Sequence, residues 1–425
     1  MLRNLLIIGL NTLIILIIFE FWFKIYDLSQ PDYFDNKKKI IAYYSNFANH
    51  PFVNFTSKKN TAGKQIHYEP GVYFQTTTNS DGFRTKRFLP KLDETFRVIL
   101  VGDSIVYSMN ANDNETLGVQ LEKSYRKNIS KKIEVLSLGI AGYSALNYAG
   151  IARTYFDYLK PDLIIVCIDE SDFNEDARKL KTLDYQYDND GYPYFIKDYP
   201  KIKISKNLSL IHKLKLESSL FNKLNYLRHK IKNIRFNKTV EKISKEKIPY
   251  LDYEKLTEDE RKNLYKIIKK NSFIMAYDFE SSKTEYNITF KSLEYVKKKS
   301  DEIGAKVFFS TFPFAWHINP EYSKLFQMRN FQTILDFRSN KVYPKLVNYY
   351  AEKLGILNLD SYDFFIKNPG KYWGDYDPHF NARGYKLYAK FLFQKTEKFI
   401  KENFVNKMWN KPTIKIENFN FIRLI

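Results

Sequence analysis

The sequence predicts an α/β fold with three layers, α/β/α, around a central parallel sheet. Three observations lead to this fold class: short apolar runs rich in β-branched residues, amphipathic helical stretches between them, and glycine or proline at the junctions. The runs lack alternation of polar and apolar residues, which indicates strands buried on both faces. Strands that alternate with helices are typical of a parallel sheet covered on both sides.

The predicted elements alternate in two blocks along the chain. The first block holds strands Phe96–Gly102, Ile133–Gly139 and Leu163–Asp169, with helices Glu115–Asn128 and Ala145–Leu159 between them. The second block holds helix Phe290–Ile303, strand Ala305–Pro313, helix Lys345–Leu354, strand Ile356–Leu359 and helix Ala382–Glu402.

These blocks divide the 425-residue chain into six segments. They are an N-terminal transmembrane anchor (1–25), a lead-in segment (26–95), the first half of the α/β domain (96–178), a basic helical insertion or lid (179–280), the second half of the domain (281–404) and a C-terminal tail (405–425).

The N-terminal segment predicts a single-pass membrane protein. Leu5–Phe23 is an almost unbroken apolar run long enough to cross a bilayer. The sequence FEFWFKIYDL (Phe19–Leu28), at the end of this run and just beyond it, offers no small residues for signal-peptide cleavage, so we expect an uncleaved anchor. Arg3 favours an N-terminus inside, whereas Lys24 and Lys37–Lys39 favour the reverse. The short tail before the span makes the first topology simpler, with the folded domain periplasmic or extracellular.

The basic insertion accounts for much of the formal net charge of +20. Lys201–Lys247 is rich in lysine and arginine, with leucine and isoleucine at helical spacing. Such a surface suits an acidic polymer, and the alternative is a solvated basic face without a ligand. Nucleic-acid binding is disfavoured because the anchor keeps the domain away from nucleic acid. The single cysteine, Cys167, excludes an internal disulfide and a cysteine-based zinc cluster.

A candidate nucleophile follows the first strand. The motif VGDS ends in Ser104, which lies where the strand passes into a helix. Reactive groups collect beyond the carboxyl ends of strands in open α/β sheets, and a serine at a helix start has its N–H directed to a developing oxyanion. The alternative is that Gly-Asp-Ser is only a turn with a helix N-cap.

A candidate base lies near the C-terminus, in WGDYDPHFNARGY. This segment contains His379, and histidine is the residue type whose pKa suits proton transfer near neutrality. Asp377, two residues earlier, can bring its carboxylate to the other ring nitrogen, and Asp375 is a poorer second candidate. Of the other five histidines, only His317 stands at a strand end.

Together these motifs resemble the SGNH, or GDSL-type, hydrolases. Gly102-Asp103-Ser104 resembles the first block of that family, Ser137–Ser144 (SLGIAGYS) the second, and DPHFNARGY the last. The resemblance implies Ser104 as nucleophile, His379 as base and Asp377 as its partner. It also implies that the backbone N–H groups of Ser104 and Gly142 form the oxyanion hole. The lead-in NSDGFR is similar to the start of membrane-anchored members.

The third block departs from the family pattern. The family has Gly-Asn-Asp after the third strand, where this chain reads CIDESDFNED (Cys167–Asp176). Aligned on Asp172, the asparagine position holds Ser171, which can donate one hydrogen bond, and Asn174 can replace it only if the loop bends differently. We predict neither a cofactor nor a metal, because the acidic loop lacks calcium-loop spacing. Its carboxylates belong to Asp169, Glu170, Asp172, Glu175 and Asp176.

The resemblance and the anchor together imply a function. We expect a serine esterase that acts through an acyl-enzyme on an acylated, O-acetylated envelope or exported polysaccharide. One alternative is an O-acyltransferase that modifies an extracytoplasmic glycan beside a multi-spanning membrane partner that exports the acyl group. Another is a catalytically weak glycan-binding scaffold on the same fold, suggested by Ser171 in place of asparagine.

Overall fold

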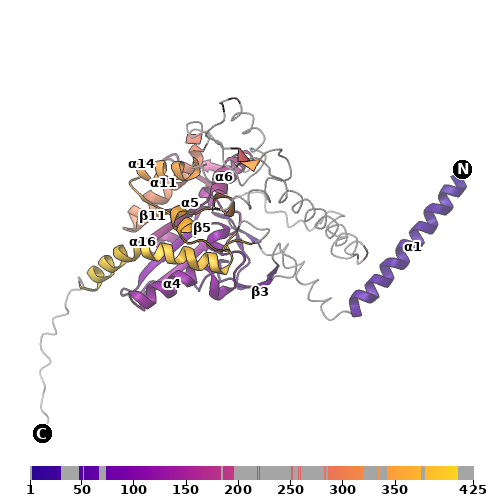
Figure 1. Ribbon diagram of the computed structural model, residues 1–425, viewed down its shortest axis with the longest axis horizontal. Coiled ribbons are helices and arrows are strands. Elements are labelled where there is room, and N and C mark those ends of the chain that lie inside the picture. The colour runs from indigo at the N-terminus through magenta and orange to yellow at the C-terminus, as the bar shows by residue number, and fades with distance from the viewer. Residues whose placement is uncertain are drawn as a thin grey trace, which may run out of the picture.

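A five-stranded parallel sheet forms the centre of the molecule (Figure 1). The computed structural model describes residues 2–29, 47–50, 52–66, 73–182, 185–195, 286–318, 342–374 and 379–409, and the isolated positions 218, 220, 250–251, 257, 259, 282–283 and 334–335. The strands of the sheet are β5 (Phe96–Gly102), β6 (Ile133–Gly139), β7 (Leu163–Ile168), β11 (Lys306–Thr311) and β13 (Leu357–Asp360).

The strand order β13-β11-β7-β5-β6 fixes where a site can form. The chain enters the sheet at β5, continues to β6 on one side, and then crosses to β7 on the other side of β5. The direction of winding therefore reverses between β5 and β7. In open α/β sheets, the crevice for ligands lies outside the carboxyl ends of the strands at such a reversal.

Helices cover both faces of the sheet, which confirms the predicted three-layer α/β/α fold. One face packs against α5 (Ala145–Leu159), α11 (Asn287–Glu302) and α14 (Val342–Lys353). The other face packs against α4 (Leu117–Asn128) and α16 (Ala382–Trp409), which lie on the opposite side in Figure 1. Successive β5 residues alternate between the two cores, as the period of a strand requires.

The predicted strands and helices all have counterparts in the structure. The bounds of β5, β6 and α5 are those predicted, and most others differ by three residues or fewer. Every residue of β5 and of β7 is buried, which explains why continuous apolar runs marked these strands so clearly. The last helix, α16, extends to Trp409 beyond the predicted end at Glu402.

The prediction of a loop over the acidic third block is wrong. That stretch forms helix α6 (Glu170–Thr182), which begins directly after β7 and passes through the predicted domain boundary at residue 178. Two short helices, α12 (Ala315–Ile318) and α15 (Tyr362–Lys367), were also not predicted.

Only part of the predicted insertion at 179–280 is described. Strands β8 (Tyr185–Tyr187) and β9 (Pro193–Phe195) form an antiparallel hairpin at its start. Apart from positions 218 and 220, the basic stretch Lys201–Lys247 lies outside the described residues, and so does the predicted helical lid.

The lead-in segment forms two strand pairs that adjoin the α/β domain. Strands β1 (Phe47–His50) and β2 (Asn54–Ser57) pair antiparallel, as do β3 (Ala62–Ile66) and β4 (Tyr73–Thr77).

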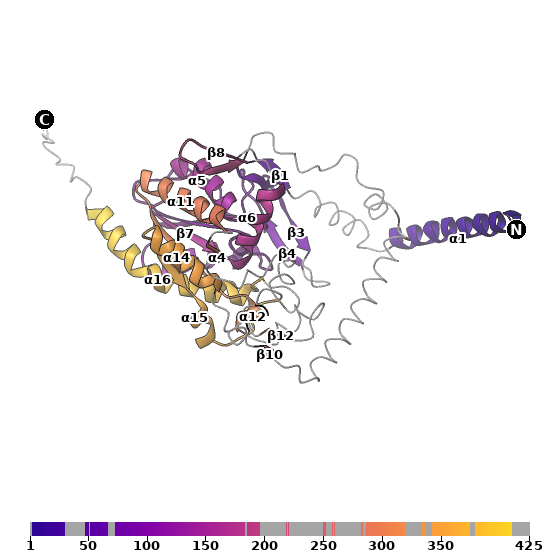
Figure 2. The same ribbon diagram turned by 90° about the horizontal axis from the view of Figure 1, so that it is seen from above.

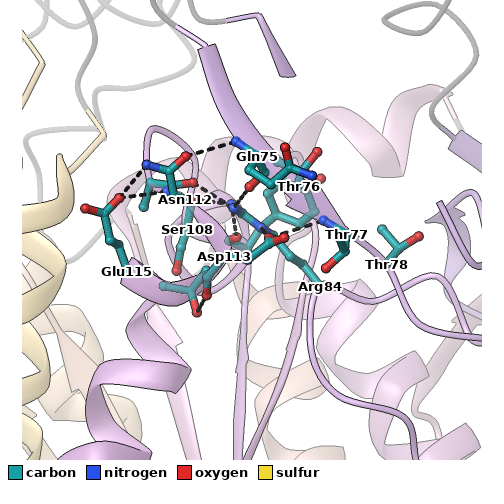
Figure 3. A network of polar contacts seen from close by, with 12 residues as sticks. Gln75, Thr76, Thr77, Thr78, Arg84, Ser108, Asn112, Asp113 and Glu115 are labelled. Atoms are coloured by element: carbon teal, nitrogen blue, oxygen red, sulfur yellow. Dashed lines mark hydrogen bonds and ion pairs between the residues drawn. The ribbon is translucent and has the colours of Figure 1, made fainter. Parts of the chain in front are cut away.

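Arg84, from the predicted lead-in motif NSDGFR, fastens this segment to the first half of the domain (Figure 3). Its guanidinium donates to the Asp113 carboxylate at 2.9 Å and to the carbonyls of Ser108 at 2.8 Å and Ala111 at 2.7 Å. A further bond of 2.8 Å reaches the Gln75 carbonyl of β4. The lead-in is thus tied to the loop that follows Ser104.

The N-terminal helix α1 (Leu2–Ser29) stands apart from the α/β domain (Figure 2). Its segment Ile7–Ile25 is 19 residues long and apolar enough to cross a membrane, and none of it is buried inside the protein. By length and composition, α1 is compatible with the predicted single-pass anchor.

Candidate active site

Ser104 stands at a tight junction between β5 and the short helix α3 (Ser104–Tyr107). Gly102 makes the junction possible, because a Cβ atom there would lie 2.4 Å from the Val106 side chain. Asp103 caps α3, and its carboxylate accepts from the Ile105 N–H at 2.9 Å. The hydroxyl of Ser104 is thereby presented at the carboxyl edge of the sheet, beside the β5–β7 reversal.

His379 reaches Ser104 from the other end of the chain. Its Nε2 lies 2.8 Å from the Ser104 Oγ, although 275 residues separate the two in sequence. Asn381, two residues later, donates to the Trp373 carbonyl at 3.2 Å. The Asn381 carbonyl oxygen Oδ1 also caps α16, accepting from the Gly384 N–H at 3.1 Å. The structure therefore brings together the predicted nucleophile and base.

The predicted carboxylate partner of His379 lies outside the described residues. Both Asp377 and its alternative Asp375 fall within 375–378. The assignment of Asp377 stays a prediction.

The Ser104 hydroxyl has two neighbours that can accept its hydrogen. One is the His379 Nε2, and the other is the Asp103 Oδ2, also at 2.8 Å. A hydroxyl donates only one hydrogen bond. Activation of Ser104 as a nucleophile requires that hydrogen to be directed to His379.

Gly142 occupies a turn beside Ser104. β5 and β6 are paired through Gly102 and Gly139, so the loops after these strands leave the sheet side by side. The Tyr143 N–H donates to the Ile140 carbonyl at 3.0 Å, and Gly142 has a φ of +83°, which a glycine adopts without strain.

Two backbone donors at this edge are available to a ligand. Within the described part of the chain, the N–H groups of Ser104 and Gly142 donate to no protein acceptor. The first residues of a helix, such as Ser104, leave their N–H groups without an intrahelical partner. Both N–H groups are thus suited to an oxyanion.

Ser171 does not supply the third oxyanion donor in this structure. It lies in the first turn of α6, and its hydroxyl donates to the Asp169 Oδ1 at 2.7 Å. Because a hydroxyl has one hydrogen, this bond leaves none for an oxyanion. The alternative, Asn174, lies in the second turn of the same helix and accepts from the Tyr286 hydroxyl at 2.9 Å.

A buried acidic cluster lies behind Ser104. Carboxylate oxygens of Asp103, Asp169 and Asp172 come within 4.8 Å of one another and could ligate a cation. Burial, followed by the charge of Asp103, raises the pKa of Asp169 well above its ordinary value. Burial and the charge of Asp169 do the same for the pKa of Asp172, to which the Tyr148 hydroxyl donates at 2.9 Å. Protons shared among these carboxyl groups would reduce the negative charge that is buried in the cluster.

The lead-in also touches the site. The Tyr143 hydroxyl donates to the Phe55 carbonyl, and the Asn147 amide donates to the Val53 carbonyl at 2.9 Å. The nearest atom to a Cβ built on Gly142 belongs to the Phe55 ring, at 3.9 Å. Nothing in the sequence indicated these contacts, because the lead-in has no marked periodicity.

The fold and the site define a class: an α/β/α protein with a serine–histidine pair at the carboxyl edge of a parallel sheet. No family model matches the sequence, and no curated protein does. Solved structures that resemble it include a protein of the G-D-S-L family from Desulfitobacterium hafniense, an alpha/beta hydrolase and two acetylxylan esterases.

Three of these structures illustrate the likeness. The acetylxylan esterase Axe2 from Geobacillus stearothermophilus, as a catalytic mutant, is 11% identical with a TM-score of 0.36, covering 72% of this chain and 95% of its own. An alpha/beta hydrolase enzyme from the metagenome of Lake Arreo is 12% identical with a TM-score of 0.35, over 71% and 95%. The lipase/acylhydrolase from Enterococcus faecalis is 12% identical with a TM-score of 0.34, over 72% and 97%. Values this low carry no inference about activity, so the functional proposal depends on the site itself.

Proposed function

We propose that this chain is a serine esterase that works through an acyl-enzyme at Ser104. The observation that carries the proposal is the 2.8 Å contact between the Ser104 Oγ and the His379 Nε2 at the β5–β7 reversal. A nucleophile within hydrogen-bond reach of a base is the basic unit of covalent acyl transfer.

The proposed reaction has two halves. In the first, His379 takes the Ser104 proton while the Ser104 Oγ attacks the ester carbonyl. The tetrahedral intermediate places its negative oxygen against the N–H groups of Ser104 and Gly142. It then collapses, the C–O bond to the alcohol breaks, and His379 returns the proton to the leaving oxygen. In the second half, His379 deprotonates a water that attacks the acyl-enzyme carbonyl. The bond between the acyl carbon and the Ser104 Oγ then breaks, and His379 returns the proton to that oxygen as the acid leaves.

The substrate class follows from the membrane anchor and the expected topology. With α1 in the bilayer and the domain on the periplasmic or outer side, the substrates within reach are extracytoplasmic. An acylated, O-acetylated envelope or exported polysaccharide is the class we propose. The formal net charge of +20 suits an acidic polymer of this kind.

A weak hydrolase is a second candidate, favoured by one observation. Because the Ser171 hydroxyl is bound to Asp169, the site lacks a third side-chain donor, and loss of one oxyanion-hole donor costs about 10²–10³ in kcat. If the acyl-enzyme reacts slowly with water, the acyl group can instead be transferred to a sugar hydroxyl, with a multi-spanning membrane partner supplying the acyl group. The other alternative is a protein that binds a glycan without turnover.

The experiment compares the full chain in detergent with Ser104→Ala, using p-nitrophenyl acetate and a fluorophosphonate probe. We expect Ser104→Ala to lose at least about 10³-fold in kcat and all labelling, because the attacking oxygen is gone. Ser124→Ala, a matched change on α4 of a serine bonded to the Gln120 carbonyl, should retain both. Equal hydrolysis by wild type and Ser104→Ala would refute the esterase proposal. Labelling without hydrolysis would favour transfer, and no labelling would favour the scaffold.

A further inference from the structure

Lys179 is a buried lysine that the proposed reaction does not yet use. It lies in the third turn of α6 and is 5% exposed. Its Nζ donates to the Gly142 carbonyl at 3.0 Å, the Ser144 Oγ at 2.6 Å and the Asn147 Oδ1 at 2.6 Å. An ammonium group has three hydrogens, so these acceptors match its full capacity. All three belong to one segment, the turn at Gly142 and the start of α5.

The segment is further bound to the same helix through Asp176. Its Oδ1 accepts from the Leu146 N–H at 3.2 Å, and its Oδ2 accepts from the Thr289 hydroxyl of α11 at 2.8 Å. Burial lowers the pKa of Lys179, and the charge of Asp176 opposes that change. A buried ammonium is costly unless it is fully hydrogen-bonded and near an opposite charge. Lys179 makes three hydrogen bonds and feels the charge of the Asp176 carboxylate.

The position of this contact matters because Gly142 carries a proposed oxyanion donor. The N–H and carbonyl of Gly142 belong to the two peptide planes that meet at its Cα. A glycine can adopt the observed φ of +83°, but it can adopt other backbone conformations as easily. A bond that fixes the carbonyl plane therefore restricts the direction of the N–H.

We propose that Lys179 is a positioning residue for the oxyanion hole, holding the Gly142 turn so that its N–H stays directed at the tetrahedral intermediate. This inference rests on the proposed esterase function. Preorganised donors stabilise the transition state without reorganising during the reaction, and the Lys179 ammonium also adds positive charge behind the Gly142 turn.

The experiment measures steady-state hydrolysis of p-nitrophenyl acetate by the full chain carrying Lys179→Met. We expect kcat to fall about 10- to 100-fold with KM changed by no more than about twofold, because a donor acting only in the transition state is misdirected. Labelling by the fluorophosphonate should slow in parallel, since it also places negative charge on an oxygen in the hole. Hydrogen exchange of the 139–148 peptide should become faster in the variant.

Lys91→Met is the matched control. Lys91 is also largely buried, at 12% side-chain exposure, and its ammonium binds the Asp162 carboxylate and the Lys160 carbonyl, each at 2.7 Å. These contacts lie at the amino end of β7, away from Ser104, so Lys91→Met should lower stability and leave kcat unchanged. A loss of kcat in Lys179→Met alone supports the inference.

Lys179→Met leaves Asp176 buried without its cation and can fail to fold. The double variant Lys179→Met with Asp176→Asn removes both charges and keeps similar volumes, so it provides the second measurement. Wild-type kcat in any folded variant that lacks the Lys179 ammonium would overturn the inference while leaving the esterase proposal intact. If Ser104→Ala is as active as wild type, the proposed function fails instead, and the role of Lys179 falls with it.

Discussion

Asp103 and His379 compete for the single hydrogen of the Ser104 hydroxyl. Asp103 and His379 each lie 2.8 Å from the Ser104 Oγ, and only one can receive its hydrogen. Carboxylate oxygens of Asp169 and Asp103 lie within 4.8 Å of each other, and burial raises the pKa of Asp169. A proton held on Asp169 and shared with Asp103 would make Asp103 a weaker acceptor for Ser104 and would favour the Ser104–His379 contact.

Asp169→Asn tests whether Asp169 holds a proton in the folded protein. The folded-state pKa of Asp169 is raised above its ordinary value of 3.8, mainly by burial, so the folded protein binds a proton that the unfolded chain releases as pH rises. The stability that Asp169 contributes is therefore fully present below its ordinary pKa and is lost as pH rises through the raised folded-state pKa. The amide that the substitution introduces would donate as the protonated acid does. We expect the variant to gain about 1–3 kcal/mol in unfolding free energy at alkaline pH.

Thermal unfolding across the pH range measures this difference. As pH rises above 3.8, the ordinary pKa of the group, the slope of melting temperature against pH should be more negative in wild type than in Asp169→Asn. Asp93→Asn, which changes an exposed carboxylate, should keep the wild-type slope. An unchanged slope in Asp169→Asn would show that Asp169 does not hold a proton in the folded state.

Ser104 and His379 were predicted from local signals, a strand end and a histidine before a helix, whereas Gly142 came from the family resemblance. Asp169 and Lys179 carry no such signal. Their roles arise only where α6 packs against the loops of β5 and β6, and contacts between residues 32 or more apart cannot be read from spacing.

At the scale of elements, α6 shows why one helix was not predicted. The buried side of a helix is usually recognised by apolar residues three or four apart. In α6, that spacing is occupied by Asp172, Asp176 and Lys179, all buried. The polar face binds the site loops through hydrogen bonds, so the helix has the composition of a loop. The strands, whose buried residues are apolar, were predicted nearly to the residue.

The contact between the lead-in and the domain gives the next prediction, Arg84→Met. Arg84 is 4% exposed, and its loss would leave the Asp113 carboxylate without its cation, with the Thr77 N–H still donating to it, and several backbone carbonyls without this donor. We expect a loss of about 3–5 kcal/mol in unfolding free energy, as when one partner of a buried ion pair is removed. Urea unfolding followed by tryptophan fluorescence measures it.

Arg126→Met is the comparison for this change. Arg126 also binds a carboxylate, that of Glu122, but its side chain is 50% exposed, so its removal should cost less than about 1 kcal/mol. Equal losses in the two variants would mean that the lead-in is not held to the domain through Arg84.

At the scale of the whole molecule, the α/β domain and α1 make separate contributions. The domain has its own cores on both faces of the sheet, and the Ile7–Ile25 segment of α1 adds no buried surface to them. The sequence separated these parts because an uninterrupted apolar run and alternating strands and helices are different patterns. The sequence could not show how the lead-in reaches the site. The hydrogen bonds between them are accepted by backbone carbonyls of the lead-in, and every residue has a backbone carbonyl.

This separation predicts the behaviour of a chain that begins at residue 30. Without α1, the protein should leave the membrane fraction and remain in the supernatant after centrifugation, since burial of a span of about 20 apolar residues is what holds a single-pass protein in a bilayer. Its hydrolysis of p-nitrophenyl acetate should have the kcat of the full chain in detergent, because neither Ser104 nor His379 depends on contacts with α1. A truncated chain that still sediments with carbonate-washed membranes would show that another surface, with the basic segment the first candidate, binds the bilayer. A soluble chain with lost activity would show that α1 supports the site rather than only its location.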